Sequence, residues 1–157
     1  MSVAVGATAE LPTGKYVGRY LILQAMPATG TGEVYAAYDP QMDRRVALTL
    51  IRSEGAQARN QLFRQAQAMA RLSHPNVASV YDVGFAGEQV FVAMELVAGA
   101  TLQQWLVDRP RQWKEVVQVF VEAGRGLNAA HLAGLAHREF QPTHVRVAPG
   151  GRVCLDG

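Results

Sequence analysis

The chain has 157 residues, of which 49% are hydrophobic and 18% charged, and its formal net charge is +2. A chain of this length and composition is expected to fold as one domain with a substantial core. The basic residues are scattered rather than gathered in a stripe with aromatic residues, which argues against nucleic-acid binding. Cys154 is the only cysteine, so the sequence excludes an internal disulfide and a cysteine-based zinc site.

No apolar run approaches membrane-spanning length, and the first nine residues have no basic region of the kind that opens a secretory signal. We therefore predict a cytoplasmic location and no membrane partner. Residues 1–15 are small, polar and interrupted by proline and glycine, which predicts a flexible N-terminal arm.

The pattern of apolar residues predicts three strands, a helix, two strands and then two helices. Short loops between the first three strands indicate an antiparallel sheet. Leu62, Ala66, Met69 and Leu72 recur at helical spacing. This order predicts an α+β fold rather than alternating βαβ units. The expected strands are residues 20–26, 33–38, 45–51, 77–83, 89–96 and 152–155, and the expected helices are residues 58–72, 101–107 and 113–132.

Several short strings, taken in order, resemble the bacterial serine/threonine protein kinases. They include Gly18-Arg19-Tyr20, the Gly-Glu-Val-Tyr of residues 32–35, the Leu-Ser-His-Pro-Asn-Val of residues 72–77 and the Val-Ala-Met-Glu-Leu-Val of residues 92–97. The resemblance implies a kinase-like small lobe over residues 16–97, built from a five-stranded antiparallel sheet and one helix. Residues 98–157 are then the first helices and the catalytic-loop region of the large lobe, with the rest of that lobe absent.

The segment that corresponds to the kinase catalytic loop has lost its working side chains. Residues 137–144 read H-R-E-F-Q-P-T-H, where the kinase pattern is H-R-D-L/F-K-P-x-N. In kinases the Asp orients the substrate hydroxyl and the Asn holds a magnesium ion. The corresponding residues here are Glu139 and His144, and Gln141 replaces the lysine. In an ungapped alignment Gly157 takes the place of the metal-binding Asp of D-F-G, and a carboxylate from Asp156 reaches that place only through a bulge.

The ion pair that holds the phosphates in kinases is also missing. The third strand of a kinase carries a lysine that contacts the α- and β-phosphates and pairs with a glutamate of the following helix. The resemblance places Thr49 and Gln65 at these two positions. A neutral pair of this kind can hydrogen-bond or pack, but it cannot neutralise phosphate. The glycine-rich loop of kinases, G-x-G-x-x-G-x-V, corresponds to residues 27–34, where Pro27 and Thr29 replace the first two glycines. We expect the loop to keep its hairpin but to bind phosphate poorly.

Only some of the residues that surround adenine in kinases have a counterpart in this sequence. Residues that match the apolar roof, the gatekeeper and the hinge strand are present, but Arg146 stands where kinases have an apolar floor. We expect Arg146 either to fill the pocket or to turn out to solvent. The vestigial nucleotide pocket consists of Val34, Ala47, Met94, Glu95, Val97 and Arg146.

The helix at 113–132 is apolar on more than one face, and later helices would cover it in a complete kinase. We predict that Val117, Phe120, Val121 and Leu127 contact another protein. A homodimer is the simplest case, because two-fold association is the commonest closed symmetry. An active kinase or its substrate is the next candidate.

These observations predict a catalytically inactive pseudokinase domain that acts as a scaffold or regulator, with no ATP or magnesium cofactor and no metal site. Two alternatives stay open. The first is a weak ATP-dependent transferase that uses Glu139 and Asp156, and the second is a nucleotide sensor that binds without chemistry.

Overall fold

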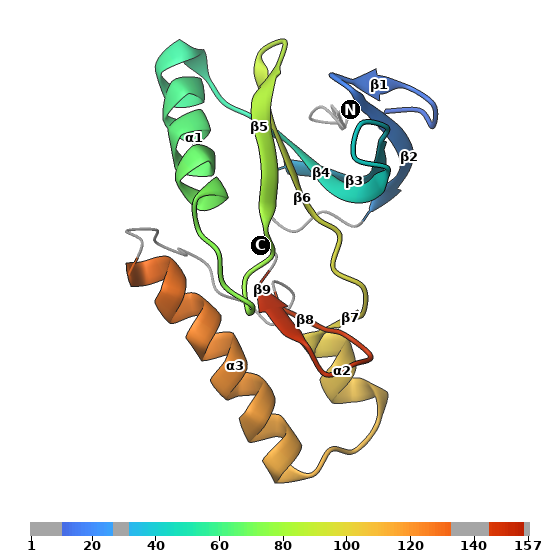
Figure 1. Cartoon of the computed structure of the whole chain (residues 1–157), viewed down its shortest axis with the longest axis vertical. Coiled ribbons are helices and arrows are strands. Elements are labelled where there is room, and N and C mark those ends of the chain that lie inside the picture. The colour runs from blue at the N-terminus through green and yellow to red at the C-terminus, as the bar shows by residue number, and fades with distance from the viewer. Residues whose placement is uncertain (1–10, 27–31, 133–144, 156–157) are drawn as a thin grey trace, which may run out of the picture.

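The computed structural model describes residues 11–26, 32–132 and 145–155, which form two lobes (Figure 1). The upper lobe is a curled sheet with one helix beside it, and the lower lobe holds two helices and a small sheet. In chain order the elements are β1 (Tyr16–Val17), β2 (Tyr20–Met26), β3 (Gly32–Asp39), β4 (Arg44–Arg52), α1 (Gly55–Ala70), β5 (Val80–Ala86), β6 (Gln89–Glu95), β7 (Ala100–Thr101), α2 (Leu102–Asp108), α3 (Trp113–Leu132), β8 (Val145–Val147) and β9 (Val153–Leu155).

The upper sheet has the strand order β1-β2-β3-β4-β6-β5, and every neighbouring pair is antiparallel. The predicted α+β small lobe is confirmed, with the two-residue β1 added to the five expected strands. Gly18 makes the turn into β2 with a φ of +55°, a left-handed conformation that glycine adopts without strain. Contacts with the sheet begin inside the predicted arm, because the Gly14 N–H donates to the Ile22 carbonyl at 2.8 Å.

Strand β4 lies in the middle of the sheet and contributes to two groups of buried side chains. Val46, Leu48 and Leu50 point to one face and pack with residues of β2, β3 and β6. Ala47 and Ile51 point to the other face and pack with α1 and β5. Successive side chains of a strand point to opposite faces. Since both faces are covered, the strand reads in the sequence as a continuous apolar run.

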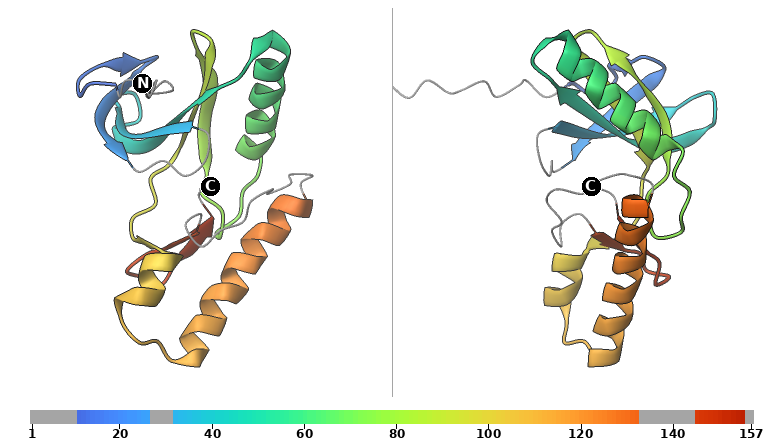
Figure 2. Two further views of the ribbon diagram at one scale, coloured as in Figure 1. Left: turned by 180° about the vertical axis from the view of Figure 1, so that it is seen from behind. Right: turned by 90° about the vertical axis from the view of Figure 1, so that its left-hand side faces the viewer.

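Helix α1 covers the second of these faces (Figure 2). Its stripe of Leu62, Ala66 and Met69 packs there, as the spacing predicted. The helix begins at Gly55, earlier than the predicted residue 58. The N-cap residue Glu54 makes no side-chain hydrogen bond to the helix, so no capping signal marks this start in the sequence.

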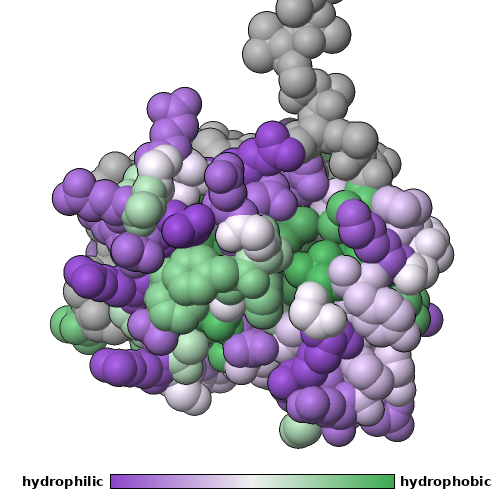
Figure 3. All heavy atoms as spheres, turned by 90° about the horizontal axis from the view of Figure 1, so that it is seen from above, coloured by the Kyte–Doolittle hydropathy of each residue, from purple (hydrophilic) through white to green (hydrophobic). Residues whose placement is uncertain are grey.

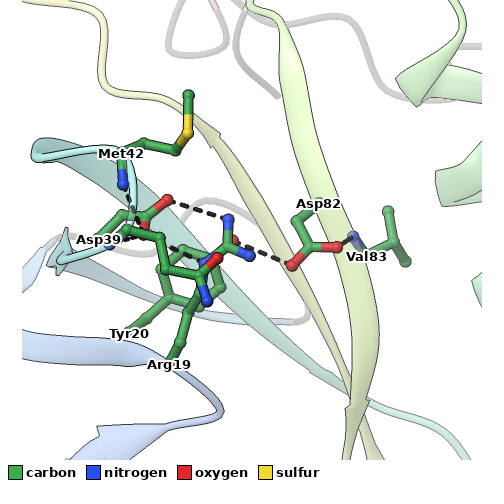
Figure 4. Close-up of polar contacts among 7 residues, drawn as sticks. Arg19, Tyr20, Asp39, Met42, Asp82 and Val83 are labelled. Carbon is green, nitrogen blue, oxygen red and sulfur yellow. Dashed lines mark hydrogen bonds and ion pairs between the residues drawn. The ribbon is translucent and has the colours of Figure 1, made fainter.

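A polar network ties together the turn after β1, the end of β3 and strand β5 (Figure 4). Arg19 donates from Nε to Asp39 Oδ1 at 3.1 Å and from Nη2 to Oδ2 at 3.0 Å. Burial raises the pKa of Asp39, but the bonds from Arg19 and from two backbone N–H groups outweigh it and hold that pKa below its usual value. The Tyr20 hydroxyl donates to Asp82 on β5 at 3.0 Å.

The lower lobe is built around the antiparallel sheet β7-β8-β9, against which α3 packs. Thr101 and Gln104 form a capping box, each side chain accepting the other residue's backbone N–H, and this fixes the start of α2. Helix α3 has the bounds predicted from its sequence pattern. Its inward face carries Val119, Ala123 and Gly126.

The apolar outer face predicted for α3 is present in part. Val117, Phe120 and Val121 are 51%, 45% and 43% exposed. The assignment of Leu127 to this face was wrong, because Leu127 is half-buried and packs against the core of the lower lobe. The reason is helical periodicity, since Leu127 lies four residues after the buried Ala123 and so falls on the inward face.

The loop before β5 joins the two lobes through hydrogen bonds. The Asn76 side-chain amide donates to the Val153 carbonyl at 2.9 Å, and the Asn76 carbonyl accepts the Leu155 N–H at 2.9 Å. Helix α3 approaches this loop closely at Gly126. A Cβ added there would lie 2.4 Å from the Asn76 carbonyl oxygen, so only glycine fits.

Candidate functional site

The roof of the predicted nucleotide pocket lies on one face of the upper sheet. Ala47 pairs with Met94, and Val34 pairs with Thr49. Residues directly opposite each other in neighbouring strands share a face, and so do residues two apart in one strand. The structure therefore places these four predicted residues on the same face. Ala47 and Met94 are both buried there.

The small sheet of the lower lobe supplies the opposite side of this site. Arg146 pairs with Cys154 across β8 and β9, so both residues lie on one face of that sheet. Cys154 packs in the same buried cluster as Ala47 and Met94, so this face is directed at the roof. The sequence analysis did not assign Cys154 to the site. Side chains alternate along the expected strand at residues 152–155, and this alternation could have placed Cys154 on one face of it.

Arg146 lies across from the roof, at the position predicted for the floor. Its Nη1 donates to the carbonyl of Gly99 at 3.3 Å, in the linker between β6 and β7. The guanidinium therefore lies toward the linker edge of the site, and the residue as a whole is half-buried. Of the six residues predicted for the pocket, Arg146 carries the only positive charge.

Glu95 and Val97 continue the hinge strand past the gatekeeper. Glu95 pairs with Val46 and so shares the face opposite to Met94. Its carboxylate accepts hydrogen bonds from Arg152, and this ion pair holds the pKa of Glu95 below its usual value although burial opposes it. The side chain thus binds the β8–β9 hairpin, and Val97 packs with the cluster of the roof.

Thr49 and Gln65 do not form a pair. No hydrogen bond joins these two described residues, and Gln65 is exposed on α1. Helix α1 turns Leu62, Ala66 and Met69 toward the sheet, and Gln65 lies at the margin of that stripe. Thr49 is half-buried between Val34 and Val92 on the neighbouring strands.

The remaining predicted positions, Glu139, Gln141, His144, Asp156 and Gly157, lie outside the described residues, as do residues 27–31 of the glycine-rich loop. The pairing of β8 with β9 is regular from Val153 to Leu155, and the bulge that the alternative use of Asp156 requires falls outside the described residues. Within residues 11–26, 32–132 and 145–155, no three His, Cys, Asp or Glu side chains are arranged to hold a metal ion. In the same part of the chain, no helix is both long and apolar enough to cross a bilayer.

The curled sheet with its helix, the hinge strand and the facing hairpin together define a protein kinase domain. The family model for the protein kinase domain matches residues 23–147. The chain belongs to the bacterial serine/threonine protein kinase family.

Among its relatives is serine/threonine-protein kinase PknL of Mycobacterium tuberculosis, 36% identical over 157 residues, which cover 98% of this chain and 39% of that protein. PknA of the same organism is 33% identical over an alignment of 164 residues, gaps included, which covers 99% of this chain and 36% of that protein. The crystal structure of the Mycobacterium tuberculosis PknI kinase domain matches with a TM-score of 0.80 at 28% identity, covering 93% of this chain and 62% of that chain. The chain thus spans less than half the length of PknL and PknA.

Proposed function

We propose that this domain is a pseudokinase that binds proteins and does not transfer phosphate. The observation that carries the proposal is the neutral, largely apolar setting of Thr49, which stands where kinases have their phosphate-binding lysine. Thr49 lies between Val34 and Val92, and Gln65, at the position of the lysine's partner, is exposed. Phosphoryl transfer depends on cations placed around the phosphates. Neither position supplies one.

Two alternatives make different use of the same site. A nucleotide sensor is favoured by Arg146, whose guanidinium brings one positive charge to the side of the site opposite the roof. A weak transferase would rely on Glu139 as the base. The extra methylene of a glutamate displaces the carboxylate, and a misplacement of about 1 Å costs roughly 100-fold in rate.

Titration with ATP and magnesium tests the proposal. We expect no shift in the thermal unfolding midpoint, no heat of binding and no transfer of radiolabel to the protein itself or to casein. The double variant Thr49→Lys/Gln65→Glu introduces a cation on the roof of the site and a carboxylate on α1, and we expect it to gain stabilisation by ATP. It serves as the positive control for the assay.

Each alternative has its own outcome in this experiment. Stabilisation by ATP without magnesium that disappears in Arg146→Ala supports the sensor. Label transfer at an ordinary turnover that disappears in Glu139→Ala supports the transferase and overturns the proposal.

We further propose that the exposed face of α3, formed by Val117, Phe120 and Val121, is the protein-binding surface, with a second copy of the chain as the first candidate partner. Light scattering is expected to give the mass of a dimer. A triple serine variant of these residues should give a monomer, and the exposed Gln118→Ser on the same helix should not. A monomer at every concentration contradicts the homodimer and leaves a different protein, such as an active kinase or its substrate, as the partner to seek.

A further inference from the structure

Tyr81 lies where strand β5 departs from regular pairing. The register with β6 shifts between Val80 and Asp82, so Tyr81 is the additional residue of a β-bulge. Strand β5 is at one end of the upper sheet, and among the described strands only β6 pairs with it. A bulge at a sheet edge re-aims its side chain, and Tyr81 is 36% exposed. The tyrosine is therefore presented to solvent at an irregular point of an edge strand.

Arg44 stacks on the ring of Tyr81. Its guanidinium carbon is 3.5 Å from the ring centroid, and the residue is half-buried. Asp39, the residue opposite Arg44 in the β3–β4 pair, has both carboxylate oxygens bonded to Arg19. Within the described residues no ion pair joins Arg44 to a carboxylate. The positive charge of Arg44 thus lies against the tyrosine, and in this part of the chain no carboxylate pairs with it.

Arg152 brings a second positive charge to the tyrosine. It forms an ion pair with Glu95, and its side chain is 43% exposed. The hydrogen bond to Glu95 raises the pKa of Arg152 although burial opposes the rise, and negative charge on the Tyr81 oxygen raises it further. That oxygen therefore lies close enough to Arg152 for the two charges to interact. Asp82, the next residue of β5, accepts a hydrogen bond from the Tyr20 hydroxyl (Figure 4).

The neighbours of Tyr81 suit a negatively charged group rather than an apolar one. The apolar surface seen from above is gathered in one area bordered by polar side chains (Figure 3). Tyr81 lies among charged side chains instead, with one arginine against its ring and another near its oxygen. A phosphate group on tyrosine carries nearly two negative charges, and arginine binds phosphate through paired N–H donors. A phosphate on the Tyr81 oxygen therefore gains two cations as neighbours.

We propose that Tyr81 is a phosphorylation site and that Arg44 and Arg152 hold its phosphate. A separate tyrosine kinase carries out the reaction, with ATP as the phosphoryl donor. The Tyr81 oxygen bonds to the γ-phosphorus, the bond from that phosphorus to the bridging oxygen of ADP breaks, and the phenolic proton goes to a base of the kinase. The phosphate then competes with Glu95 for Arg152, so the modification acts on a contact between the lobes. The site does not depend on whether this domain itself transfers phosphate.

Phosphorus nuclear magnetic resonance tests whether the arginines hold the phosphate. The protein is made with phosphotyrosine incorporated at position 81, and a peptide of residues 78–84 with the same phosphotyrosine is the reference. The second pKa of such a phosphate is about 6. Neighbouring cations favour the doubly charged form, so we expect this pKa to be lower by about 0.5 in the folded protein than in the peptide.

Substitutions assign this difference to the two arginines. Arg44→Gln and Arg152→Gln are each expected to remove part of it, and Arg45→Gln should leave it unchanged. Arg45 is the matched control because it is exposed and adjacent in β4, and successive side chains of a strand point to opposite faces.

Treatment with ATP, magnesium and a tyrosine kinase of broad specificity tests the modification itself. The kinase is chosen for its ability to phosphorylate the unmodified peptide of residues 78–84. Mass spectrometry of the digested protein is expected to find phosphate on Tyr81, whereas Tyr20 and Tyr35 should stay unmodified because they are buried.

Three results overturn the inference: no phosphate on Tyr81 with a kinase that phosphorylates the peptide, equal pKa values in protein and peptide, or a pKa that both arginine substitutions leave unchanged. None of these results bears on the ATP titration or on the mass of the protein in solution.

Discussion

Replacing Gly126 with alanine tests whether the close approach of α3 to the Asn76 loop holds the lobes together. The new Cβ would lie 2.4 Å from the Asn76 carbonyl oxygen and 3.1 Å from its carbon. That oxygen accepts the Leu155 N–H, so the methyl group must displace either the acceptor or the helix. Gly124, on the same helix, is the matched control, because a Cβ there meets nothing within 4 Å.

The two substitutions are expected to change stability in opposite directions. Alanine is favoured over glycine inside a helix by about 1 kcal/mol, and Gly124→Ala should gain this amount. At Gly126 the same gain is opposed by overpacking of about 1–3 kcal/mol and by roughly 1 kcal/mol for the weakened hydrogen bond. Gly126→Ala is therefore expected to be about 1–3 kcal/mol less stable than the unsubstituted protein.

Urea unfolding measures this difference, and thermal unfolding provides a second estimate at about 2–4 °C per kcal/mol for a chain of this size. The midpoint should fall in Gly126→Ala and rise in Gly124→Ala, with the urea dependence of the unfolding free energy unchanged. If Gly126→Ala is as stable as Gly124→Ala, the helix does not contact the loop as described.

Arg152→Gln removes the ion pair with Glu95, and since Arg152 is 43% exposed and screened by solvent, urea unfolding should show a loss below about 1 kcal/mol at neutral pH. The folded-state pKa of Glu95 is lowered, so the contribution of the ion pair is present above the ordinary glutamate pKa and disappears as the pH falls through the folded value. The hydrogen bond from Arg152 Nε to the Pro75 carbonyl does not titrate, so a difference that is equally large at neutral pH and in strong acid contradicts the pairing. Burial and a hydrogen bond to a carboxylate raise the pKa of Tyr20 to about 12, so an ultraviolet titration should show a tyrosine that ionises at this high pH, and ionisation of every tyrosine near pH 10 refutes the buried hydroxyl. Leu48→Ala should lower the free energy of unfolding by about 2–5 kcal/mol, whereas Val107→Ala at an exposed position should change it little; equal effects would place Leu48 outside the core.

The pattern of apolar residues predicted an element best where buried side chains recur along much of its length. Helix α3 has its predicted bounds because Val119 and Ala123 recur at helical spacing, and β4 was recognisable as an apolar run. Leu127 was misplaced because helical spacing groups it with Val119 and Ala123, but the sequence does not say which apolar face of α3 contacts the sheet.

Contacts between distant segments were not accessible in this way. The resemblance predicted which positions form the roof of the site, and the strand register shows only that Ala47 and Met94 share a face. Neither periodicity nor resemblance indicated that Phe63 stacks on Phe85 or that Gln65 turns to solvent. Such contacts depend on the angle at which a helix meets a sheet, and many side chains set that angle together.

The Asn76 loop gives the molecule a second attachment between its halves, in addition to the covalent linker that contains Gly99. The ion pair between Glu95 and Arg152 adds a further contact on the same side. The halves therefore cannot separate without breaking this ion pair and the hydrogen bonds to Val153 and Leu155, a cost that the linker alone would not impose.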